Sequence, residues 1–362
     1  MKKFAGGLLV AALAPLVLAA CGAGDNGSGG TQRVFMLLPN STTTRFTERD
    51  APLFQEALKK YAPEAEVTLL NAEGDANKQQ DQMNDAITQG ADVVVLISAD
   101  SNLAAGELAT ASQAKVPVVL YDHDAIGGEA AAQVVFDSLQ VGEEQGKKAA
   151  ELINAMPGQG IPIARLKGNP GEYGTTQYTK GQDEFLQPLI DSGKINVVCD
   201  KNIQNWDPTL AQSFAEDCLT KENNNVKLFV TMNDGLSGGV IAALTAQHLD
   251  GQIPVTGGQD ANLDAVQYVA QGKLVNTVFK DLAAEADAAA KVTASVLKGD
   301  GVPEDMVNGE IDNKFMKVPA VFLPVQNVTA KNLDVLIQTK TWTWDDICQG
   351  ATAQTEVCKS HA

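Results

Sequence analysis

Short runs of β-branched and apolar residues alternate along this chain with longer segments whose apolar residues recur at helical spacing. The spacing of the runs is roughly that of one strand and one helix. Because the runs are apolar almost throughout, rather than alternating with polar residues, they predict parallel sheets that helices cover on both faces. The predicted strands are 34–38, 67–70, 93–97, 116–121, 161–166, 195–199, 228–231, 254–256 and 274–279.

The segments between the predicted strands carry apolar residues on one helical face. In 51–60 Phe54 and Ala57 share a face, and in 75–89 Met83 and Ala86 do so. About 340 residues follow the N-terminal 20, which is more than one hydrophobic core usually supports. The sequence therefore predicts an α/β protein with two Rossmann-like domains.

The first 20 residues have the composition of a signal peptide. Lys2 and Lys3 precede an almost wholly apolar or small stretch, which ends on Leu-Ala-Ala directly before Cys21. This stretch is too short and too rich in alanine and glycine to span a bilayer core. We predict a lipoprotein signal peptide over 1–20.

A glycine-rich segment follows Cys21 and contains too few apolar residues to be buried in a folded core. Such a composition behaves as a flexible tether, here predicted over 21–32. A lipid on Cys21 would then anchor an exported protein to the outer face of the cytoplasmic membrane, at the cell surface or in the periplasm.

The net charge limits the partners of the exported part. Removing the first 20 residues removes two of the 27 basic residues, which leaves 25 against 45 acidic residues and a net charge of −20. Nucleic acids and anionic membrane surfaces would repel such a chain. We therefore expect no nucleic-acid partner.

Four cysteines remain if Cys21 carries a lipid, and an exported protein can pair all four. Three connectivities are possible. Proximity in the sequence favours the disulfides Cys199–Cys218 and Cys348–Cys358. We expect no metal site, because the chain has no CxxC motif and its three histidines do not lie at ligand spacing from the cysteines.

Polar residues gather where the predicted strands end, which is where open α/β sheets bind their ligands. These positions are rich in Asp and Asn, include aromatic residues and contain no phosphate loop. They predict a small, polyhydroxylated ligand and no cofactor. The positions are 40–46, 100–102, 121–123, 169–176, 205–207, 233–234, 259–260 and 280.

A sugar matches this composition because its hydroxyl groups both donate and accept hydrogen bonds while its ring has apolar faces. Phe46 and Trp206, one from each half of the chain, are predicted to sandwich the ring. The polar residues predicted around it are Arg45, Asp122, Asn233, Asp234 and Asp260. Any single Asp or Asn in such a position can instead be a helix N-cap.

Several motifs resemble the periplasmic sugar-binding proteins of ABC transporters, of the ribose and galactose type and the xylose-binding branch in particular. The resemblance runs from about 34 to 325. Its most specific element is Gly-Gln-Asp-Ala at 258–261. The other motifs are Gly74-Asp75 with Gln79 to Met83, Tyr121-Asp122, Asn233-Asp234 followed by 238–244, and Thr277-Val278-Phe279-Lys280.

This resemblance implies a periplasmic binding protein fold of type I, in which a three-segment hinge joins the two domains and lets them close on an aldose. It predicts one lobe over 33–137 and 261–300, a second over 138–260 and 301–346, and a tail over 347–362. The ligand contacts predicted from residues and resemblance together are Arg45, Phe46, Asp122, His123, Trp206, Asn233, Asp234, Asp260 and Lys280.

Two departures bear on the identity of the sugar. His123 stands where the xylose binders commonly have arginine, and 168–174 differs from their asparagine-bearing loop. An imidazole cannot reproduce a bidentate guanidinium. The predicted ligand is therefore D-xylose or a related aldose such as glucose. The protein is predicted to be a monomer that delivers this sugar to an ABC permease in the cytoplasmic membrane.

Three alternatives remain open. A glycoside-acting enzyme needs two carboxylates, which Asp122 and Asp260 could supply, but the chain has neither GxSxG nor HExxH. A sugar-responsive repressor needs a DNA-binding head, where this chain has a lipobox and a tether. A receptor that feeds a sensor kinase would use the same ligand-binding chemistry.

Overall fold

The computed structural model describes residues 31–170 and 172–361. The predicted signal peptide, the lipid attachment site Cys21 and almost all of the tether lie outside the described residues. In the part that is described, no helix combines the length and the apolar character needed to cross a membrane.

The first half of the fold is built on a seven-stranded sheet with the order β12-β13-β5-β4-β3-β1-β2. All neighbouring strands are parallel except β12 and β13, which run antiparallel at one edge. The strands are β1 (Gln32–Leu38), β2 (Ala65–Asn71), β3 (Val93–Leu96), β4 (Val118–Tyr121), β5 (Ala132–Phe136), β12 (Gly309–Asp312) and β13 (Lys317–Leu323).

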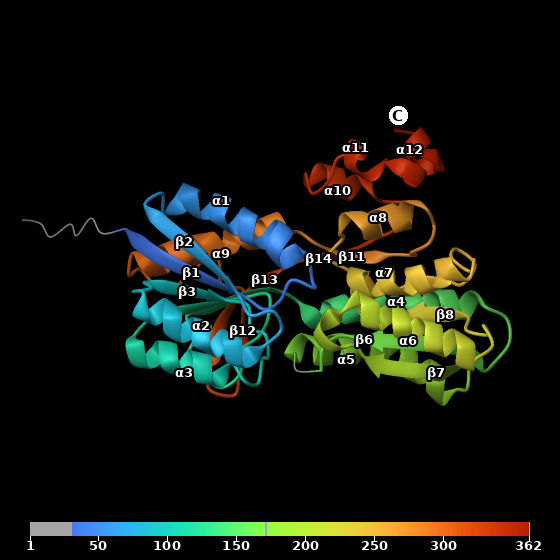
Figure 1. Cartoon of the computed structure of the whole chain (residues 1–362), viewed down its shortest axis with the longest axis horizontal. Helices are drawn as coiled ribbons and strands as arrows, with labels where there is room; N and C mark the ends of the chain where they lie inside the picture. The colour runs from blue at the N-terminus through green and yellow to red at the C-terminus, as the bar shows by residue number, and fades with distance from the viewer. Residues whose placement is uncertain (1–30, 171, 362) are drawn as a thin grey trace, which may run out of the picture. The chain divides into compact units, whose positions relative to one another are not determined.

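Helices cover both faces of this sheet, as the apolar strands predict (Figure 1). Successive residues of a strand point to opposite faces, so Val34 of β1 joins the core beneath α1 and α9, whereas Phe35 joins the core beneath α2 and α3. A strand buried on both faces must be apolar at every position. The helices are α1 (Ala51–Tyr61), α2 (Ala76–Thr88), α3 (Ala105–Ala114) and α9 (Leu282–Leu297).

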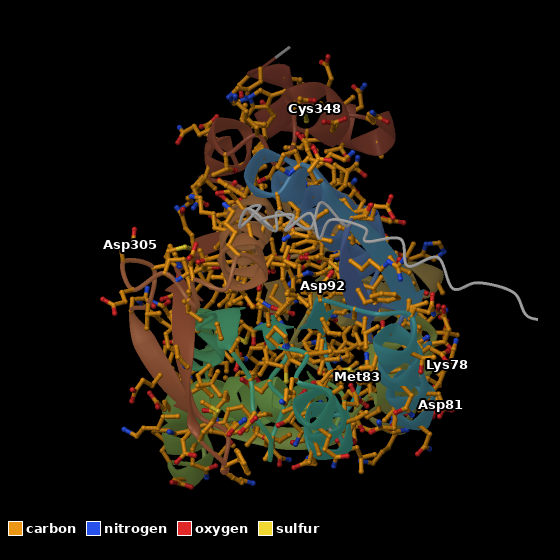
Figure 2. The ribbon with its side chains drawn as sticks, turned by 90° about the vertical axis from the view of Figure 1, so that its left-hand side faces the viewer. Lys78, Asp81, Met83, Asp92, Asp305 and Cys348 are labelled. Atoms are coloured by element: carbon orange, nitrogen blue, oxygen red, sulfur yellow. A yellow bond between two sulfur atoms is a disulfide. The ribbon has the colours of Figure 1, made fainter. Side chains whose placement is uncertain are left out.

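Helix α2 shows how the polar and apolar residues are divided. Met83 is fully buried against the sheet, whereas Lys78 and Asp81 are exposed at the outer edge (Figure 2). The side chain of Asp75 accepts from the backbone N–H groups of Asn77 and Lys78 and so caps the start of the helix. The helix predicted over 75–89 is confirmed.

The second half contains two smaller sheets, with the strand orders β7-β6-β8-β9 and β10-β11-β14. All of their pairs are parallel except β11 with β14. The strands are β6 (Ile161–Lys167), β7 (Ile195–Asn202), β8 (Leu228–Val230), β9 (Val255–Thr256), β10 (Gly258–Gln259), β11 (Thr277–Lys280) and β14 (Val325–Val328).

Five helices pack around these sheets and share two apolar cores with them. Pairs of glycines let two of the helices approach closely: a Cβ atom on Gly142 of α4 or Gly181 of α5 would clash with the backbone of the other helix. The helices are α4 (Ser138–Ala155), α5 (Tyr173–Asp191), α6 (Pro208–Lys221), α7 (Asp234–Ala246) and α8 (Leu263–Ala270).

The chain passes between the two halves at three places. It leaves the first sheet after β5 and enters α4, returns from β11 into α9, and leaves again between β13 and β14. The predicted α/β fold with two Rossmann-like domains and three connections is confirmed.

The sheets correct the predicted lobe boundaries for two segments. The segment 309–323, predicted in the second lobe, forms β12 and β13 of the first sheet, because β13 pairs with the edge of β5. The segment 263–280, predicted in the first lobe, belongs to the second half, where Val266 and Val278 are fully buried in its core. The other boundaries remain a prediction.

The residues after β14 form a small helical cap on the second half, beside α8 (Figure 1). The buried Leu336, Ile347 and Cys358 join the same core as α8, and Gln267 of α8 donates to the backbone oxygen of Asp346 at 3.0 Å. The cap contains α10 (Asp334–Gln338), α11 (Trp344–Ile347), the 3-10 helix η3 (Gly350–Gln354) and α12 (Glu356–Lys359).

Both predicted disulfides are confirmed. Cys199 at the middle of β7 is bonded to Cys218 of α6, and Cys348 is bonded to Cys358 within the helical cap. Each bond closes a short local loop.

Replacing Cys199 and Cys218 together by alanine is expected to lower the free energy of unfolding by about 3 kcal/mol, because the bond restricts the unfolded chain across 19 residues. Guanidinium denaturation of the oxidised protein measures this. The same denaturation in a reducing buffer should abolish the difference. Equal stabilities in the oxidised state would contradict the prediction.

Glu107 of α3 is only 1 % exposed, and its Oε2 atom has no hydrogen-bond partner among the described residues. Burial raises the pKa of Glu107 to about 8. The folded state therefore holds a proton that the unfolded state releases near its ordinary pKa, and the resulting stabilisation is lost as the pH rises through about 8.

Glu107→Gln is accordingly expected to change the melting temperature more favourably at pH 9 than at pH 5, because the amide never becomes charged. Thermal melts at both pH values measure the difference. Glu64→Gln, on an exposed side chain, is the matched control and should behave alike at both. A Glu107→Gln effect that is the same at both pH values would refute the assignment.

Candidate functional site

A cavity lies where the carboxyl ends of the strands of the two halves meet. It is lined by Thr43, Arg45, Phe46, Ser101, Asp122, His123, Asp124, Ser138, Glu172, Gly174, Tyr178, Trp206, Asn233, Gln259, Asp260 and Lys280.

Three of the lining residues have a backbone in the left-handed region, and this conformation directs their side chains. Asp122, Trp206 and Asp260 have φ angles of 55°, 54° and 94°, which residues other than glycine rarely adopt. Asp122 directly follows β4, Asp260 follows β10, and Trp206 ends the 3-10 helix η2 (Gln204–Trp206). Such strain is typical of functional sites, because the surrounding fold must hold it.

Arg45 is the centre of a buried ionic network. It directly precedes the π-helix η1 (Phe46–Asp50), and only 1 % of it is exposed. Its Nε and Nη2 atoms donate to the two carboxylate oxygens of Asp50 at 2.7 and 2.8 Å. Nη2 also donates to Glu285 of α9 at 2.9 Å, and Nη1 donates to Asp260 at 3.1 Å.

This network connects the two halves of the fold. Arg45 comes from the first half and Asp260 from the second, and Asp122 lies 3.5 Å from the Nη1 atom of Arg45. Most of the Arg45 donors are occupied by carboxylates of the protein. Arg45 is therefore placed to orient Asp122 and Asp260 within the cavity.

Lys280 supplies a second buried cation at the end of β11. Its Nζ atom lies 3.3 Å from the Oδ1 atom of Asp122 and 3.6 Å from that of Asp260. Burial disfavours the charged lysine, but these carboxylates outweigh it and hold the pKa of Lys280 above its ordinary value. Lys280 is therefore a charged donor at neutral pH.

The pKa values of two carboxyl groups in the network shift in opposite directions. Burial works against ionisation of Asp122, but Arg45 and Lys280 outweigh it and hold the pKa of Asp122 well below its usual range. Burial, together with Asp122, raises the pKa of Glu285 well above its usual range. Asp122 is thus an ionised acceptor toward the cavity, whereas Glu285 lies behind it against Arg45.

Two aromatic residues reach the cavity from opposite halves of the fold. Phe46 lies edge-on to the His123 ring, with the centroids 5.3 Å apart. Trp206 packs against Tyr178 at 6.3 Å and donates its Nε1 hydrogen to the Oε2 atom of Glu172 at 2.7 Å. The Trp206 ring also occupies the space where a Cβ atom on residue 168 would lie, so glycine is required there.

The structure brings together eight of the nine predicted ligand contacts. They are Arg45, Phe46, Asp122, His123, Trp206, Asn233, Asp260 and Lys280, all of which line the cavity. Asn233 is also the N-cap of α7, since its Oδ1 atom accepts from the backbone N–H of Leu236 at 2.8 Å. The prediction of a capping role and that of a ligand contact are therefore compatible at this residue.

Asp234 corrects the predicted set, because it does not line the cavity. Its carboxyl group instead accepts from the Thr277 hydroxyl at 2.7 Å and from the backbone N–H of Asn262 at 2.8 Å. Burial and the neighbouring Asp260 raise its pKa well above the usual range. Asp234 connects α7, β11 and the segment that precedes α8.

The prediction omitted several residues of the cavity, of which Glu172 and Tyr178 have clear positions. Glu172 immediately precedes α5, in the loop after β6, and Tyr178 lies on the same helix. The unusual sequence of 168–174 was a signal for Glu172. Tyr178 had no such signal, because an aromatic residue within a helix normally packs in the core.

The sequence of residues 34–301 matches a protein family described as periplasmic binding protein domain. The D-xylose-binding periplasmic protein of Haemophilus influenzae is 32% identical over 270 residues, which are 75% of this chain and 79% of that protein. The corresponding protein of Escherichia coli is 31% identical over 286 residues, which are 79% and 83% of the two chains.

A solved structure is also similar in fold. It is a carbohydrate transporter solute-binding protein from Chloroflexus aurantiacus in complex with D-glucose. The TM-score is 0.76 and the sequence identity 25%, and the match covers 87% of this chain and 98% of the other.

Proposed function

Because the chain belongs to the periplasmic binding protein domain family, we propose that it captures a monosaccharide in the cavity between its two halves and delivers it to an ABC importer. The observation that carries the proposal is the cavity itself. It combines the ionised acceptor Asp122, the charged donor Lys280 and aromatic rings from both halves. The chain is a binding protein and not an enzyme.

Each part of a sugar has a matching group in this cavity. Asp122 and Asp260 accept hydrogen bonds from hydroxyl groups, and Lys280 donates to them. Phe46 and Trp206 pack against the apolar faces of the ring. D-xylose and the related aldose D-glucose are the two ligands we propose. Two relatives are named D-xylose-binding periplasmic proteins, and a solved structure of similar fold is a complex with D-glucose.

Binding would close the two halves around the sugar. The three connecting segments allow a hinge rotation, and the ion pair of Arg45 with Asp260 joins the halves next to the cavity. The sugar shifts the population toward the closed form by as much as it binds that form more tightly. We propose that the permease recognises the closed monomer, which a lipid on Cys21 keeps at the membrane.

A thermal-shift screen against pentoses, hexoses and polyols tests this proposal. A ligand that binds only the folded state stabilises it by about 2.7 kcal/mol at a concentration of 100 Kd, so one sugar is expected to raise the melting temperature by several degrees. Sucrose, a disaccharide and not a monosaccharide, is the matched negative control. A flat response across all the monosaccharides would overturn the proposal.

A further inference from the structure

Three ionisable side chains converge at one end of the cavity without touching one another. The Nε2 atom of His123 lies 3.8 Å from the Oδ2 atom of Asp122 and 3.9 Å from the Oε2 atom of Glu172. These distances are too long for direct hydrogen bonds. A single oxygen atom can lie about 2.8 Å from both Nε2 and Oε2, which are 3.9 Å apart.

The hydrogen-bond partner of the Nδ1 atom determines the tautomer of His123. Nδ1 lies 2.7 Å from the backbone oxygen of Ser98. Because a carbonyl oxygen can only accept, we assign the proton of a neutral ring to Nδ1, which leaves Nε2 to face the cavity as an acceptor. The edge-on contact with Phe46 further fixes the ring.

Glu172 is held as firmly as His123. Trp206 donates to its Oε2 atom at 2.7 Å and Asn169 donates to its Oε1 atom at 3.3 Å. It is only 5 % exposed, and His123 is the one basic side chain within 4 Å of its carboxyl group among the described residues. Glu172 therefore offers a fixed acceptor to the cavity.

Three carboxyl groups interact electrostatically with His123: Asp122 after β4, Asp124 in the following loop, and Glu172 before α5. Burial raises the pKa of Asp124 to about 6 and also raises that of Glu172. A neutral imidazole would turn a lone pair toward these oxygens. An imidazolium would instead turn an N–H donor toward the ligand.

We propose that the His123 imidazolium and Glu172 together read one hydroxyl group of the sugar, as its donor and its acceptor, so that affinity falls as the pH rises. This inference rests on the proposed function. Binding should weaken when the ring loses its proton, because a neutral Nε2 atom accepts a hydrogen bond and no longer donates one. His123 and Glu172 would then determine which sugar is accepted at that position.

Calorimetric titrations between pH 5.5 and 8.5, with the sugar found in the thermal-shift screen, test the inference. The Kd of the unmodified protein should rise about tenfold, in line with the strength of one hydrogen bond to a charged group. His123→Asn and His123→Arg, which cannot lose a proton in this range, should show a flat profile. His248→Asn, at an exposed histidine, should keep the full dependence.

Several outcomes separate the possibilities. A flat profile of the unmodified protein overturns the inference while leaving sugar binding intact, whereas no binding at any pH overturns the proposed function. If His123→Arg keeps the dependence and Glu172→Gln removes it, the titrating group is Glu172, and the role of His123 is refuted.

A different observation concerns the helical cap after β14. Trp342 contacts both halves of the fold: its Nε1 atom donates to the backbone oxygen of Ala261 at 2.8 Å, and the guanidinium of Arg49 lies 4.5 Å from its ring centroid. Arg49 also donates to the backbone oxygen of Thr341 at 3.1 Å. Ala261 directly follows the cavity residue Asp260.

The two ends of this contact belong to different halves. Arg49 lies in η1, the helix that begins with Phe46 of the cavity. The cap is fixed to α8 of the second half, where Gln271 donates to the Thr352 hydroxyl at 2.6 Å. The geometry points to the cap as a strap that joins η1 to the second half and so favours the arrangement in which Arg45 meets Asp260.

Arg49→Gln tests the strap. Loss of the cation–π contact and one hydrogen bond is expected to raise the Kd for the sugar about five- to tenfold, mainly through faster dissociation. Small-angle X-ray scattering should show a larger radius of gyration without sugar. Arg49→Lys, which keeps the positive charge, should raise the Kd and the radius of gyration less than Arg49→Gln does. Trp344→Phe, within the same cap, should change neither quantity. An unchanged Kd and radius in Arg49→Gln would overturn the strap.

Discussion

Replacing Arg45 by methionine is expected to lower the free energy of unfolding by about 3–5 kcal/mol, because it leaves buried carboxylates without their cation. Lys280 would still pair with Asp122 and Asp260 in this variant. Asp50, which pairs with Arg45, would lose that partner. Urea denaturation at pH 7 measures the loss. Sugar binding should disappear with it, because Asp122 and Asp260 lose the group that orients them.

Arg33→Met is the matched control, since Arg33 is exposed and its side chain donates to the backbone oxygen of Gln89. Its stability should remain within about 0.5 kcal/mol of the unmodified protein. Adding Asp50→Asn to Arg45→Met should restore part of the stability, because one uncompensated charge is removed. A loss below about 1 kcal/mol in Arg45→Met would refute the central place of this network.

Replacing Trp206 by alanine is expected to weaken sugar binding by about 1–3 kcal/mol, the scale of burying one large apolar side chain. The ring is packed between Gly168 and Tyr178, and its N–H group holds Glu172 in the cavity. Alanine therefore removes an apolar surface and also frees an acceptor. Calorimetric titration measures the change in affinity.

Trp206→Phe separates these two contributions, because it retains an aromatic face and removes the donor to Glu172. Its affinity should lie between those of the unmodified protein and the alanine variant. Trp344→Ala, in the helical cap, is the matched control and should bind normally, since Trp344 stacks on His361 and does not line the cavity. Normal affinity of Trp206→Ala would contradict its contact with the sugar.

The sequence was sufficient to predict the repeated strands, because each is a local apolar run. The run of β1 is apolar where both faces are buried, and the glycines and capping residues of the intervening helices agree with it. Neither β5 nor β13 was among the predicted strands. Their pairing joins segments almost two hundred residues apart, so the local pattern could not assign 309–323 to the first sheet.

The candidate site shows the same limit. Position at the end of a strand was enough to predict that Asp122 and Asp260 line the cavity. The same argument also predicted Asp234, but the carboxyl group of Asp234 accepts a hydrogen bond from the Thr277 hydroxyl and does not line the cavity. The two cases differ in where a backbone turn directs the side chain. The pairing of Arg45 with Glu285, 240 residues further along, depends wholly on tertiary structure.

The most direct test of the account is a calorimetric titration of the protein with D-xylose and with D-glucose, repeated on Asp122→Asn. We predict saturable binding of at least one of these sugars with one site per chain, and a clear loss of affinity in the variant, because Asp122 is the ionised acceptor of the cavity. Absence of binding to both sugars, or binding that Asp122→Asn leaves unchanged, would contradict the account.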